Sequence, residues 1–436
     1  MTVRILVTGD LHIGRRPTRL AHPDRAERAS AARMWHAIID RAIAEKVDAV
    51  LLSGDVVDHD NRFYEATGPL ERGMRRLAEA TIPTFAVAGN HDWDVFPRIL
   101  NQLDTGRFQF LGRDGQWQAG ILQRDGEVKP VLRIVGWSFP ARHVQRNPLT
   151  GFHIEADPEI PTVGLLHTDV DGASSDYAPV DLSALQACDL DLWVLGHVHK
   201  PQFWDSQTGA KVLYPGSPQA LNPGESGVHG PWLISLEGAG RVECRQLPMS
   251  RVRYDRCEVD VSGIDTPEDF ETRVNETLMS FLKDISPEEE LLEVLSLRMD
   301  FVGATPLCTR IDKLAESICD LERSYDKVVG RIDKWTNQTR PAINLDELVR
   351  RKDPTGLLAR TLVALEREES DPSLEKMISD ATTRLKEVYQ ASAYVPLVDS
   401  GPPADRSLAR EILIQQVRHL LDTLCRQRSD FQEGDA

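Results

Sequence analysis

Residues 85–94 read FAVAGNHDWD: an apolar run stops at Gly89, and an amide, an imidazole and a carboxylate follow without a spacer. Taken alone, the stretch is typical of a turn, because Gly-Asn tolerates positive φ and Asp can cap a following helix. The same arrangement, an apolar run that ends in polar groups, recurs along the chain. The recurrence, rather than the single stretch, favours a functional interpretation.

Five short apolar runs predict buried strands: VRILVT (3–8), AVLLS (49–53), TFAVA (84–88), TVGLLH (162–167) and LWVLG (192–196). Amphipathic stretches at 30–46 and 65–80 separate the first three runs. A β-α-β-α-β order of this kind produces right-handed crossovers and parallel pairs of strands. We therefore predict an α/β fold with a parallel sheet.

Each of these runs ends in residues of metal-binding type. The endings are GDLH (9–12), GDVVD (54–58), GNHD (89–92), His167 and GHVH (196–199). Any one of them alone is more often a helix cap or a buried imidazole than a ligand. Because ligands gather beyond the carboxyl ends of strands in open α/β sheets, we predict that all five endings meet at one edge.

The predicted ligands are carboxylates, imidazoles and one amide: Asp10, His12, Asp55, Asn90, His167, His197 and His199. This set suits borderline cations such as Mn²⁺, Fe or Zn²⁺, and we expect Mn²⁺. So many donors exceed the need of one tetrahedral ion and fit two ions that share a carboxylate. Two such metals can hold the attacking and leaving oxygens of a phosphoryl transfer, with a bridging hydroxide as nucleophile.

The predicted catalytic residues follow the amide ligand in the opening stretch. His91 stands at the next position of the loop, where an imidazole that binds no metal could protonate the leaving oxygen or stabilise its charge. Asp92 is predicted to orient His91, because a catalytic acid or base is commonly held by a third group.

With these motifs in this order, the sequence resembles the calcineurin-like metallophosphoesterase superfamily over its N-terminal part, to about residue 240. The resemblance implies a core of two packed sheets flanked by helices, and it makes His91 the proton donor. It also implies a division of the ligands between two metals: Asp10, His12 and His199 for one, Asn90, His167 and His197 for the other, with Asp55 bridging.

Two features indicate the branch of the superfamily. GDVVD lacks the Arg-Gly that follows this motif in Ser/Thr protein phosphatases. The segments KPQFWD (200–205) and LYPGSPQALNPGES (213–226) are similar to those of SbcD-type DNA-repair exonucleases. Some of those proteins have His at the position of Asp58, so the resemblance assigns no role to Asp58 or to its neighbour His59.

The remaining chain resembles that branch only in layout. We predict a nuclease domain at 1–254, a small α/β capping domain at 255–340 and a C-terminal helical region at 341–436, interrupted by a linker at 395–406. The last predicted helix, Ser407–Arg428, has a broad apolar face. That face could pack on its own domain or dock a partner, which the resemblance implies is an SbcC-type coiled-coil ABC ATPase.

A net charge of −17 argues against a general polyanion-binding surface, so any contact with DNA must be local. The candidate DNA-binding residues are Arg15, Arg16, Arg19 and Arg142. Their alternative role is to pair on the surface with acids such as Asp24 and Glu27. Trp93 could stack on a base or pack in the core.

Targeting signals are not evident. The six cysteines form no CxxC pair, which is typical of reduced thiols in the cytosol. The first residues, MTVRILVTGD, turn polar too soon for a signal peptide, and no apolar run of roughly 18 residues predicts a membrane span. We predict a cytoplasmic protein, associated with the bacterial nucleoid.

These observations predict a two-metal-dependent DNA nuclease, an exonuclease subunit for DNA repair that works with the ATPase and can form a homodimer. The alternative is a small-molecule phosphatase or cyclic-nucleotide phosphodiesterase of the same superfamily, for which the long C-terminal part would have little use. A binding subunit with vestigial catalysis is a third class, disfavoured because every ligand position holds a competent residue. Exonuclease or endonuclease preference and strand polarity stay open.

Overall fold

The computed structural model describes most of the chain: residues 2–58, 63–101, 107–124, 126, 129–153, 157, 159–172, 175–206, 209–238, 240–285, 289–319, 321–368, 371–390 and 405–433. The chain divides into two compact units. One comprises Met1–Arg256, Leu278–Arg298 and Glu322–Asp333, and the other comprises Cys257–Thr277, Met299–Leu321 and Lys334–Ala436. The predicted domain boundaries at 254 and 340 stay predictions.

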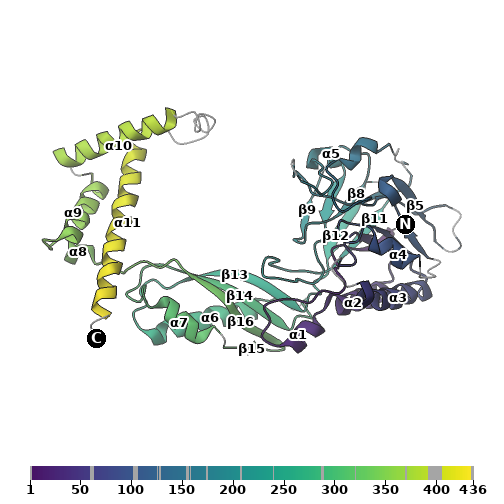
Figure 1. Cartoon of the computed structure of the whole chain (residues 1–436), viewed down its shortest axis with the longest axis horizontal. Coiled ribbons are helices and arrows are strands. Elements are labelled where there is room, and N and C mark those ends of the chain that lie inside the picture. The colour runs from purple at the N-terminus through teal and green to yellow at the C-terminus, as the bar shows by residue number, and fades with distance from the viewer. Residues whose placement is uncertain are drawn as a thin grey trace. The chain divides into compact units, whose positions relative to one another are not determined.

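The first sheet contains three of the five predicted strands. Its order is β12-β11-β1-β2-β3-β4 (Figure 1). The members are β1 (Thr2–Thr8), β2 (Ala49–Ser53), β3 (Thr84–Val87), β4 (Phe108–Phe110), β11 (Trp232–Glu237) and β12 (Val242–Gln246). Strands β1 to β4 pair in parallel, and β11 joins β1 antiparallel. The predicted parallel β-α-β-α-β order is confirmed.

Helices cover one face of this sheet. They are α2 (Ala31–Glu45), α3 (Phe63–Glu79) and α4 (Val95–Leu100). The preceding helix, α1 (Pro23–Arg28), buries no residue and forms an ion pair with Glu322 through Arg25. The apolar faces of α2 and α3 bury Trp35, Ile38 and Leu70 against the sheet. Helix α3 can approach this closely because Gly73 has no side chain: a Cβ there would lie 2.2 Å from Trp35 Nε1.

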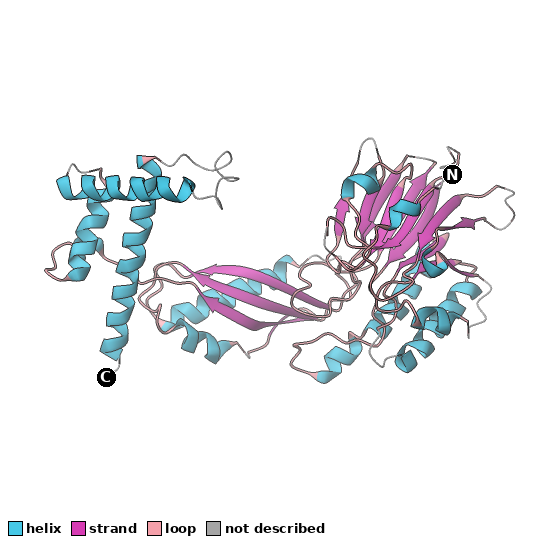
Figure 2. Ribbon diagram, turned by 45° about the horizontal axis from the view of Figure 1, so that its top comes forward, coloured by secondary structure: helices cyan, strands magenta, loops and turns pink. Residues whose placement is uncertain are grey.

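The second sheet holds the other two predicted strands and has the order β5-β6-β7-β8-β10-β9. Its strands are β5 (Gln118–Leu122), β6 (Leu132–Trp137), β7 (Thr162–His167), β8 (Leu192–Gly196), β9 (Gln202–Trp204) and β10 (Lys211–Tyr214). A short 3-10 turn, η1 (Arg113–Gly115), precedes β5, and η2 (Pro148–Gly151) and α5 (Leu182–Gln186) lie in the later loops. Figure 2 shows the strands of the core in magenta.

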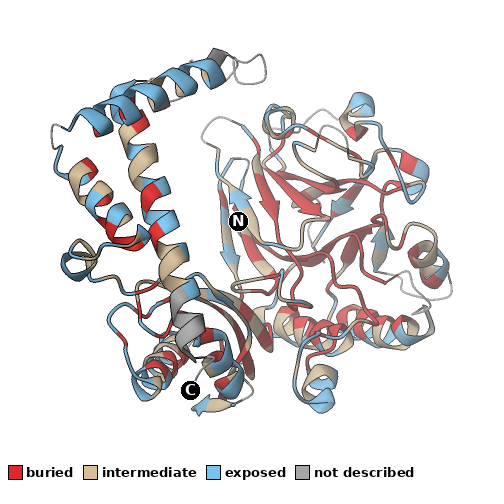
Figure 3. Cartoon of the chain, turned by 60° about the vertical axis from the view of Figure 1, so that its left-hand side comes forward, coloured by how far each residue is buried: buried red, intermediate tan, exposed pale blue. Residues whose placement is uncertain are grey.

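The two sheets pack face to face. Ile5 and Phe85 of the first sheet share one buried cluster with Leu165 and Val194 of the second. The strands are coloured as buried over most of their length (Figure 3). The five predicted strands therefore end on two packed sheets, and the expectation that one sheet edge carries all five endings is wrong. The packed pair of sheets agrees with the fold that the resemblance implied.

A third sheet follows with the order β13-β14-β16-β15. Its strands are β13 (Val252–Asp260), β14 (Val294–Val302), β15 (Arg323–Tyr325) and β16 (Val328–Asn337), with helices α6 (Pro267–Asp284) and α7 (Ile311–Ile318) between them. The ring of Phe270 on α6 lies 5.1 Å from the ring of Phe301 on β14. The oxygen of Thr266 accepts a hydrogen bond from the Asp269 backbone N–H, as expected for a residue that caps α6.

The C-terminal part is helical: α8 (Leu345–Leu348), α9 (Pro354–Glu366), α10 (Pro372–Gln390) and α11 (Arg406–Glu433). Leu362 of α9, Ile378 of α10 and Leu421 of α11 share one buried cluster. The predicted linker at 395–406 lies almost entirely outside the described residues. Among the helices that the structure describes, none is both long and apolar enough to cross a membrane.

Candidate metal centre

The loops that leave both sheets converge beyond the strand ends. The backbone N–H groups of Asp10 and His12, after β1, donate to the carbonyl oxygens of Gly54 and Asp55, after β2 (3.0 and 2.9 Å). The N–H of His197, after β8, donates to the Asp10 carboxylate (3.0 Å). The loops of two sheets are thus joined by hydrogen bonds at the site that the sequence predicted.

Glycines allow this approach. A Cβ on Gly89 would lie 2.2 Å from Asp55 Oδ1, and a Cβ on Gly196 would lie 2.1 Å from the carbonyl oxygen of Ser53. Both distances are far inside van der Waals contact. The glycine in the GNHD and GHVH motifs is therefore required by space, because each one lets a neighbouring loop come close.

Ligand positions also carry unusual backbone conformations. Asp10, His12 and Asp55 have φ values of 49°, 45° and 48°, and His197 has a φ of 102°. Residues other than glycine seldom adopt positive φ, and each such position costs roughly 1–3 kcal/mol. The surrounding hydrogen bonds hold these residues in strained conformations that turn their side chains toward one another.

One group of ligand atoms comes from Asp10, His12 and His199, and these atoms lie within 4.8 Å of one another. The Nε2 atoms of His12 and His199 are 3.0 Å apart. Asp10 and His12 are fully buried. Burial raises the pKa of Asp10, against the lowering effect of nearby His199.

A second group comes from Asp10, Asp55 and His167, with the same spacing. His167 Nε2 lies 3.0 Å from Asn90 Oδ1 and 3.4 Å from Asp55 Oδ2. His197 Nδ1 is 3.3 Å from the same Asn90 oxygen. Burial raises the pKa of Asp55, but His167 and His12 outweigh burial, and the net pKa lies below its usual value.

The donor set fits a pair of divalent cations. Buried carboxylates are costly unless positive charge compensates them, and Asp10 and Asp55 are 0% and 2% exposed. His12 Nδ1 is buried and makes no hydrogen bond within the described part of the chain, and two imidazole nitrogens face each other at 3.0 Å. Carboxylate, imidazole and amide donors at this spacing are the ligands that Mn²⁺, Fe or Zn²⁺ accept. All seven predicted ligands belong to this cluster.

The sequence analysis did not identify Glu225, which lies behind His199. Glu225 Oε1 is 3.0 Å from His199 Nδ1, and Ser217 Oγ and the Leu221 N–H donate to Oε2 (2.9 and 2.8 Å). Burial lowers the pKa of His199, but Glu225 and Asp10 outweigh it and raise the pKa to about 9. Glu225 fixes the ring so that Nε2 faces His12. Its one sequence signal was its place in the segment LYPGSPQALNPGES.

His91 lies at the rim of the cluster, with its side chain 33% exposed. Its ring packs edge-on against the ring of His12, with centroids 5.0 Å apart. Its backbone N–H donates to Asp55 Oδ1 (2.8 Å). Burial holds the pKa of His91 below its usual value, and the carboxylates of Asp55 and Asp58 offset only part of this effect.

The carboxylate beside His91 is that of Asp58. Asp58 Oδ1 lies 3.9 Å from His91 Nδ1, 3.5 Å from His12 Nδ1 and 2.9 Å from Arg15 Nε. The sequence analysis assigned Asp58 no role, and its neighbour His59 lies outside the described residues.

Asp92 is directed elsewhere. Its carboxylate accepts hydrogen bonds from the backbone N–H groups of Gly89, Val56 and Val57 (2.7, 2.7 and 3.3 Å). These contacts tie the loop after β3 to the loop after β2. Burial and the nearby Asp55 raise the pKa of Asp92 well above its usual value. Asp92 therefore lies at the site but holds the backbone of two loops, instead of contacting His91 as the sequence analysis predicted. The carboxylate that faces the His91 ring belongs to Asp58.

The basic loop after β1 is largely neutralised. Arg15 pairs with the buried Asp58, and Arg16 pairs with Glu27 (2.5 Å) and, more loosely, with Glu65 (4.0 Å). Both arginines therefore have a structural role that competes with the predicted contact to DNA. Arg19 and Arg142, the other two candidates, are exposed.

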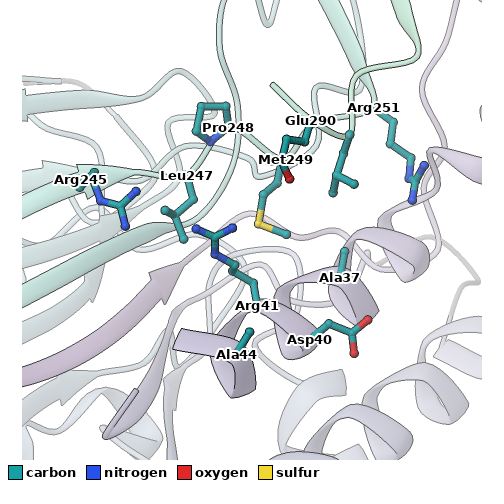
Figure 4. Close-up of a pocket in the computed structure, with 11 residues that line it drawn as sticks. Ala37, Asp40, Arg41, Ala44, Arg245, Leu247, Pro248, Met249, Arg251 and Glu290 are labelled. Atoms are coloured by element: carbon teal, nitrogen blue, oxygen red, sulfur yellow. The ribbon is translucent and has the colours of Figure 1, made fainter. Parts of the chain in front are cut away.

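The unit that holds the metal centre also contains a cavity of about 540 Å³, which Figure 4 shows in close-up. Arg41, Arg245 and Arg251 surround an apolar floor that includes Leu247 and Met249. The arginines are engaged by acids: Arg41 with Glu45, and Arg251 with Glu293. None of the predicted metal ligands lines this cavity.

Comparison of the sequence with those of known proteins gives three findings. Residues 3–201 match the sequence model of the calcineurin-like phosphoesterase family. An uncharacterized metallophosphoesterase, YhaO of Bacillus subtilis, is 26% identical over 336 residues, which are 74% of this chain and 78% of that protein. The DNA double-strand break repair protein Mre11 of Methanopyrus kandleri is 23% identical over 305 residues, 66% of each chain.

Among solved structures, a dimetal phosphatase from Danio rerio aligns with 56% of this chain and 98% of its own. The sequence identity is 15% and the TM-score is 0.35.

Proposed function

From the premise that residues 3–201 are a calcineurin-like metallophosphoesterase domain, we propose that this chain is a two-metal-dependent DNA nuclease. The observation that carries the proposal is the buried cluster of carboxylates and imidazoles at the strand ends of two sheets. The choice of DNA rests on the distant similarity to proteins named DNA double-strand break repair protein Mre11. The coarser activity, metal-dependent hydrolysis of a phosphoester, does not depend on that choice.

We assign the ligands to two cations as the resemblance to the metallophosphoesterase superfamily divides them; the close approach of Asp10, His12 and His199 supports the first of the two groups. One cation would take Asp10, His12 and His199, the other would take Asn90, His167 and His197, and Asp55 would be shared. Two divalent cations bound there would activate a water molecule and stabilise charge on the phosphate. Mn²⁺ is the expected metal.

The chain's own residues would orient the substrate and move the proton. His91 stands at the exposed rim, where its imidazole can reach a leaving oxygen. Asp58, clamped by Arg15, would hold the His91 ring and favour its charged form. Asp58, rather than Asp92, is therefore our candidate for the group that positions the proton donor.

The substrate and partner proposals concern the rest of the chain. Arg19 and Arg142 would contact phosphates without reading bases. We assign 1–254 to the nuclease, 255–340 to a capping domain, and 341–436 to a helical region that binds an SbcC-type coiled-coil ABC ATPase. Leu357 on helix α9 and Leu420 on helix α11 are 60% and 52% exposed. Exposed leucines are expected on a helical surface that a partner covers.

The direct test is hydrolysis of DNA by the purified chain with Mn²⁺. Wild-type protein is expected to degrade DNA and to lose the activity in EDTA. His91→Ala is expected to bind the same amount of metal, by elemental analysis, and to cleave at least ~100-fold more slowly, as expected for loss of a general acid.

The controls separate the levels of the proposal. Metal-loaded protein that is inert on single-stranded, double-stranded and nicked DNA, yet hydrolyses a small phosphoester, would make it a small-molecule phosphatase or cyclic-nucleotide phosphodiesterase. A His91→Ala variant with unchanged cleavage would remove His91 from the mechanism and leave the metal assignment intact.

A further inference from the structure

Three aromatic rings form a column beside the metal centre. The ring of Tyr177 lies 4.8 Å from that of His197, with an interplanar angle of 38°. The ring of His143 lies 5.8 Å from that of Tyr177, at 39°. The column runs from a predicted metal ligand to an exposed residue, because His143 is exposed and Tyr177 is half-buried.

Backbone pairing between two loops builds this column. Val144 and Tyr177 form an isolated parallel bridge. The Val144 N–H donates to the Asp176 carbonyl (2.7 Å), and the Ala178 N–H donates to the Val144 carbonyl (2.6 Å). Gln145 Nε2 donates to the Asp176 carboxylate (2.6 Å). His143 and Tyr177 are therefore held in register, although they lie far apart in the sequence.

The loop is also strained directly after Tyr177. Ala178 is fully buried and has a φ of 51°, a conformation that alanine rarely adopts. The hydroxyl of Thr168 donates to the Ala178 carbonyl (2.5 Å) and holds it in place. Strain of this kind persists only where the surrounding structure enforces it. The hydrogen bonds of Ala178 to Val144 and Thr168 enforce it here, directly beside Tyr177.

Trp93, the stacking residue considered from the sequence, occupies a different position. It packs against the cluster that contains Phe139 and Trp193, and its buried Nε1 has no hydrogen-bond partner among the residues that the structure describes. An aromatic face that a substrate can reach is instead offered by His143, with Tyr177 behind it.

We propose that His143, backed by Tyr177, is a platform on which a nucleobase of the substrate stacks while the adjacent phosphodiester lies at the metal centre. The inference rests on the proposed nuclease function and narrows its substrate to a strand with an unpaired base. An imidazole or phenol ring stacks on any base, so the platform favours single strands or frayed ends without reading sequence. The exposed Arg142 next to His143 is placed to contact the neighbouring phosphate.

Binding without catalysis is the first test. The metal-free full chain in EDTA is titrated with a short single strand that carries 2-aminopurine at its terminal base, whose fluorescence falls when the base stacks. Wild-type protein and Tyr177→Phe are expected to quench the probe. His143→Ala is expected to bind about 10-fold more weakly and to quench less. His153→Ala, which removes another exposed imidazole outside the column, is the matched control and is expected to behave as wild type.

The second test separates stacking from a merely structural role. With Mn²⁺, cleavage is measured on an intact strand and on one with an abasic site at the nucleotide next to the scissile phosphate. Wild-type protein is expected to show a KM about 10-fold higher on the abasic strand. In His143→Ala the two substrates are expected to have similar KM values, because the platform is already lost.

Two results would overturn the inference. Equal probe quenching by wild type and His143→Ala would show that no base stacks there. A fall in kcat alone, equal on the intact and abasic strands, would assign the rings to support of His197. Failure of the nuclease proposal looks different, because wild-type protein would then cleave no DNA, whatever the probe reports in EDTA.

Discussion

The metal centre and the C-terminal helices are built in opposite ways. The centre gathers side chains from five strand ends of two sheets, and two of these residues, Asp10 and His199, are 189 positions apart along the chain. The helical part folds from neighbouring segments, with α9, α10 and α11 packed on one another. The centre therefore needs both sheets of the core to be in place, whereas the buried cluster of the helices is made by segments that follow one another in the sequence.

The backbone shows the same contrast. Ligand positions such as Asp10 and His197 have positive φ. The helices α9 and α10 begin at ordinary caps, where the carboxylates of Asp353 and Asp371 accept backbone N–H groups. The metal centre contains residues in strained backbone conformations, whereas the C-terminal helices begin with residues in the conformations that they commonly adopt. Function is therefore expected to be lost by small changes at the centre and stability by larger changes in the helices.

The largest effect is expected from Asp55, the carboxylate that we propose the two cations share. Asp55→Asn keeps the shape of the side chain but removes its negative charge from the centre, so metal content and hydrolysis should fall together, the latter on the order of 10³-fold. Elemental analysis and a cleavage assay measure the two. The matched change in the helices, Asp371→Asn, keeps a good cap and should alter neither. Full metal content in Asp55→Asn would contradict the shared-ligand assignment.

The next effect concerns space rather than charge. Gly196→Ala would place a Cβ 2.1 Å from the Ser53 carbonyl oxygen. We expect about 3 kcal/mol of lost stability from this overpacking, together with weaker metal binding. Gly151→Ala is the control, since a Cβ there meets no atom of the described residues within 4 Å. Calorimetry measures the melting temperatures of both variants. Equal values would mean that the loops after β2 and β8 can move apart without loss of stability.

Adjacent leucines of α11 provide a test within the helices. Leu421 is 1% exposed and Leu420 is 52% exposed. Leu421→Ala should destabilise the helical part by about 2 kcal/mol, and Leu420→Ala should have little effect on the free chain. Amide hydrogen exchange of α9 and α11 measures this locally. Hydrolysis of a small phosphoester should be unchanged in both variants; a loss there would show that the helices and the centre depend on each other.

The smallest effect is a dependence on pH in the helices. Hydrogen bonds from Thr355 and Gly356, with Arg351, lower the pKa of Asp353 to about 2. The pKa of Asp353 in the folded chain lies below the value of 3.8 expected in the unfolded chain. The ionised carboxylate therefore stabilises the fold fully above pH 3.8, and this stabilisation is lost as the pH falls through about 2. Asp353→Asn should flatten this dependence in the exchange rates of α9. An unchanged profile would assign the acid sensitivity to another group.

Much of the centre could be predicted from the sequence because its residue types stand out against apolar strands. The strands AVLLS and LWVLG coincide with β2 and β8. All the predicted ligands meet, since strand ends are close whichever of the two packed sheets they leave. The pattern could not assign the strands to two sheets, because a buried run looks the same in either.

What the sequence could not predict depends on contacts between distant segments. Glu225, Asp58 and Tyr177 are ordinary residues until folding places them beside His199, His91 and His197. The helices show the same limit on a smaller scale. Ala409 of α11 is buried and Leu420 is exposed, although Leu420 belongs to the broad apolar face of that helix. The periodicity of apolar residues predicts which face of a helix is apolar. The neighbouring helices determine which residues of that face are buried.

The antiparallel strand β11 has a consequence for where the protein can be cut. The family match ends at residue 201, yet β11 fills the place beside β1, and Glu225 supplies the carboxylate behind His199. A fragment that ended at 201 would leave β1 with an open backbone edge, which recruits other chains into aggregates. The stretch that matches the family model is thus too short to supply the strand that pairs with this edge of β1.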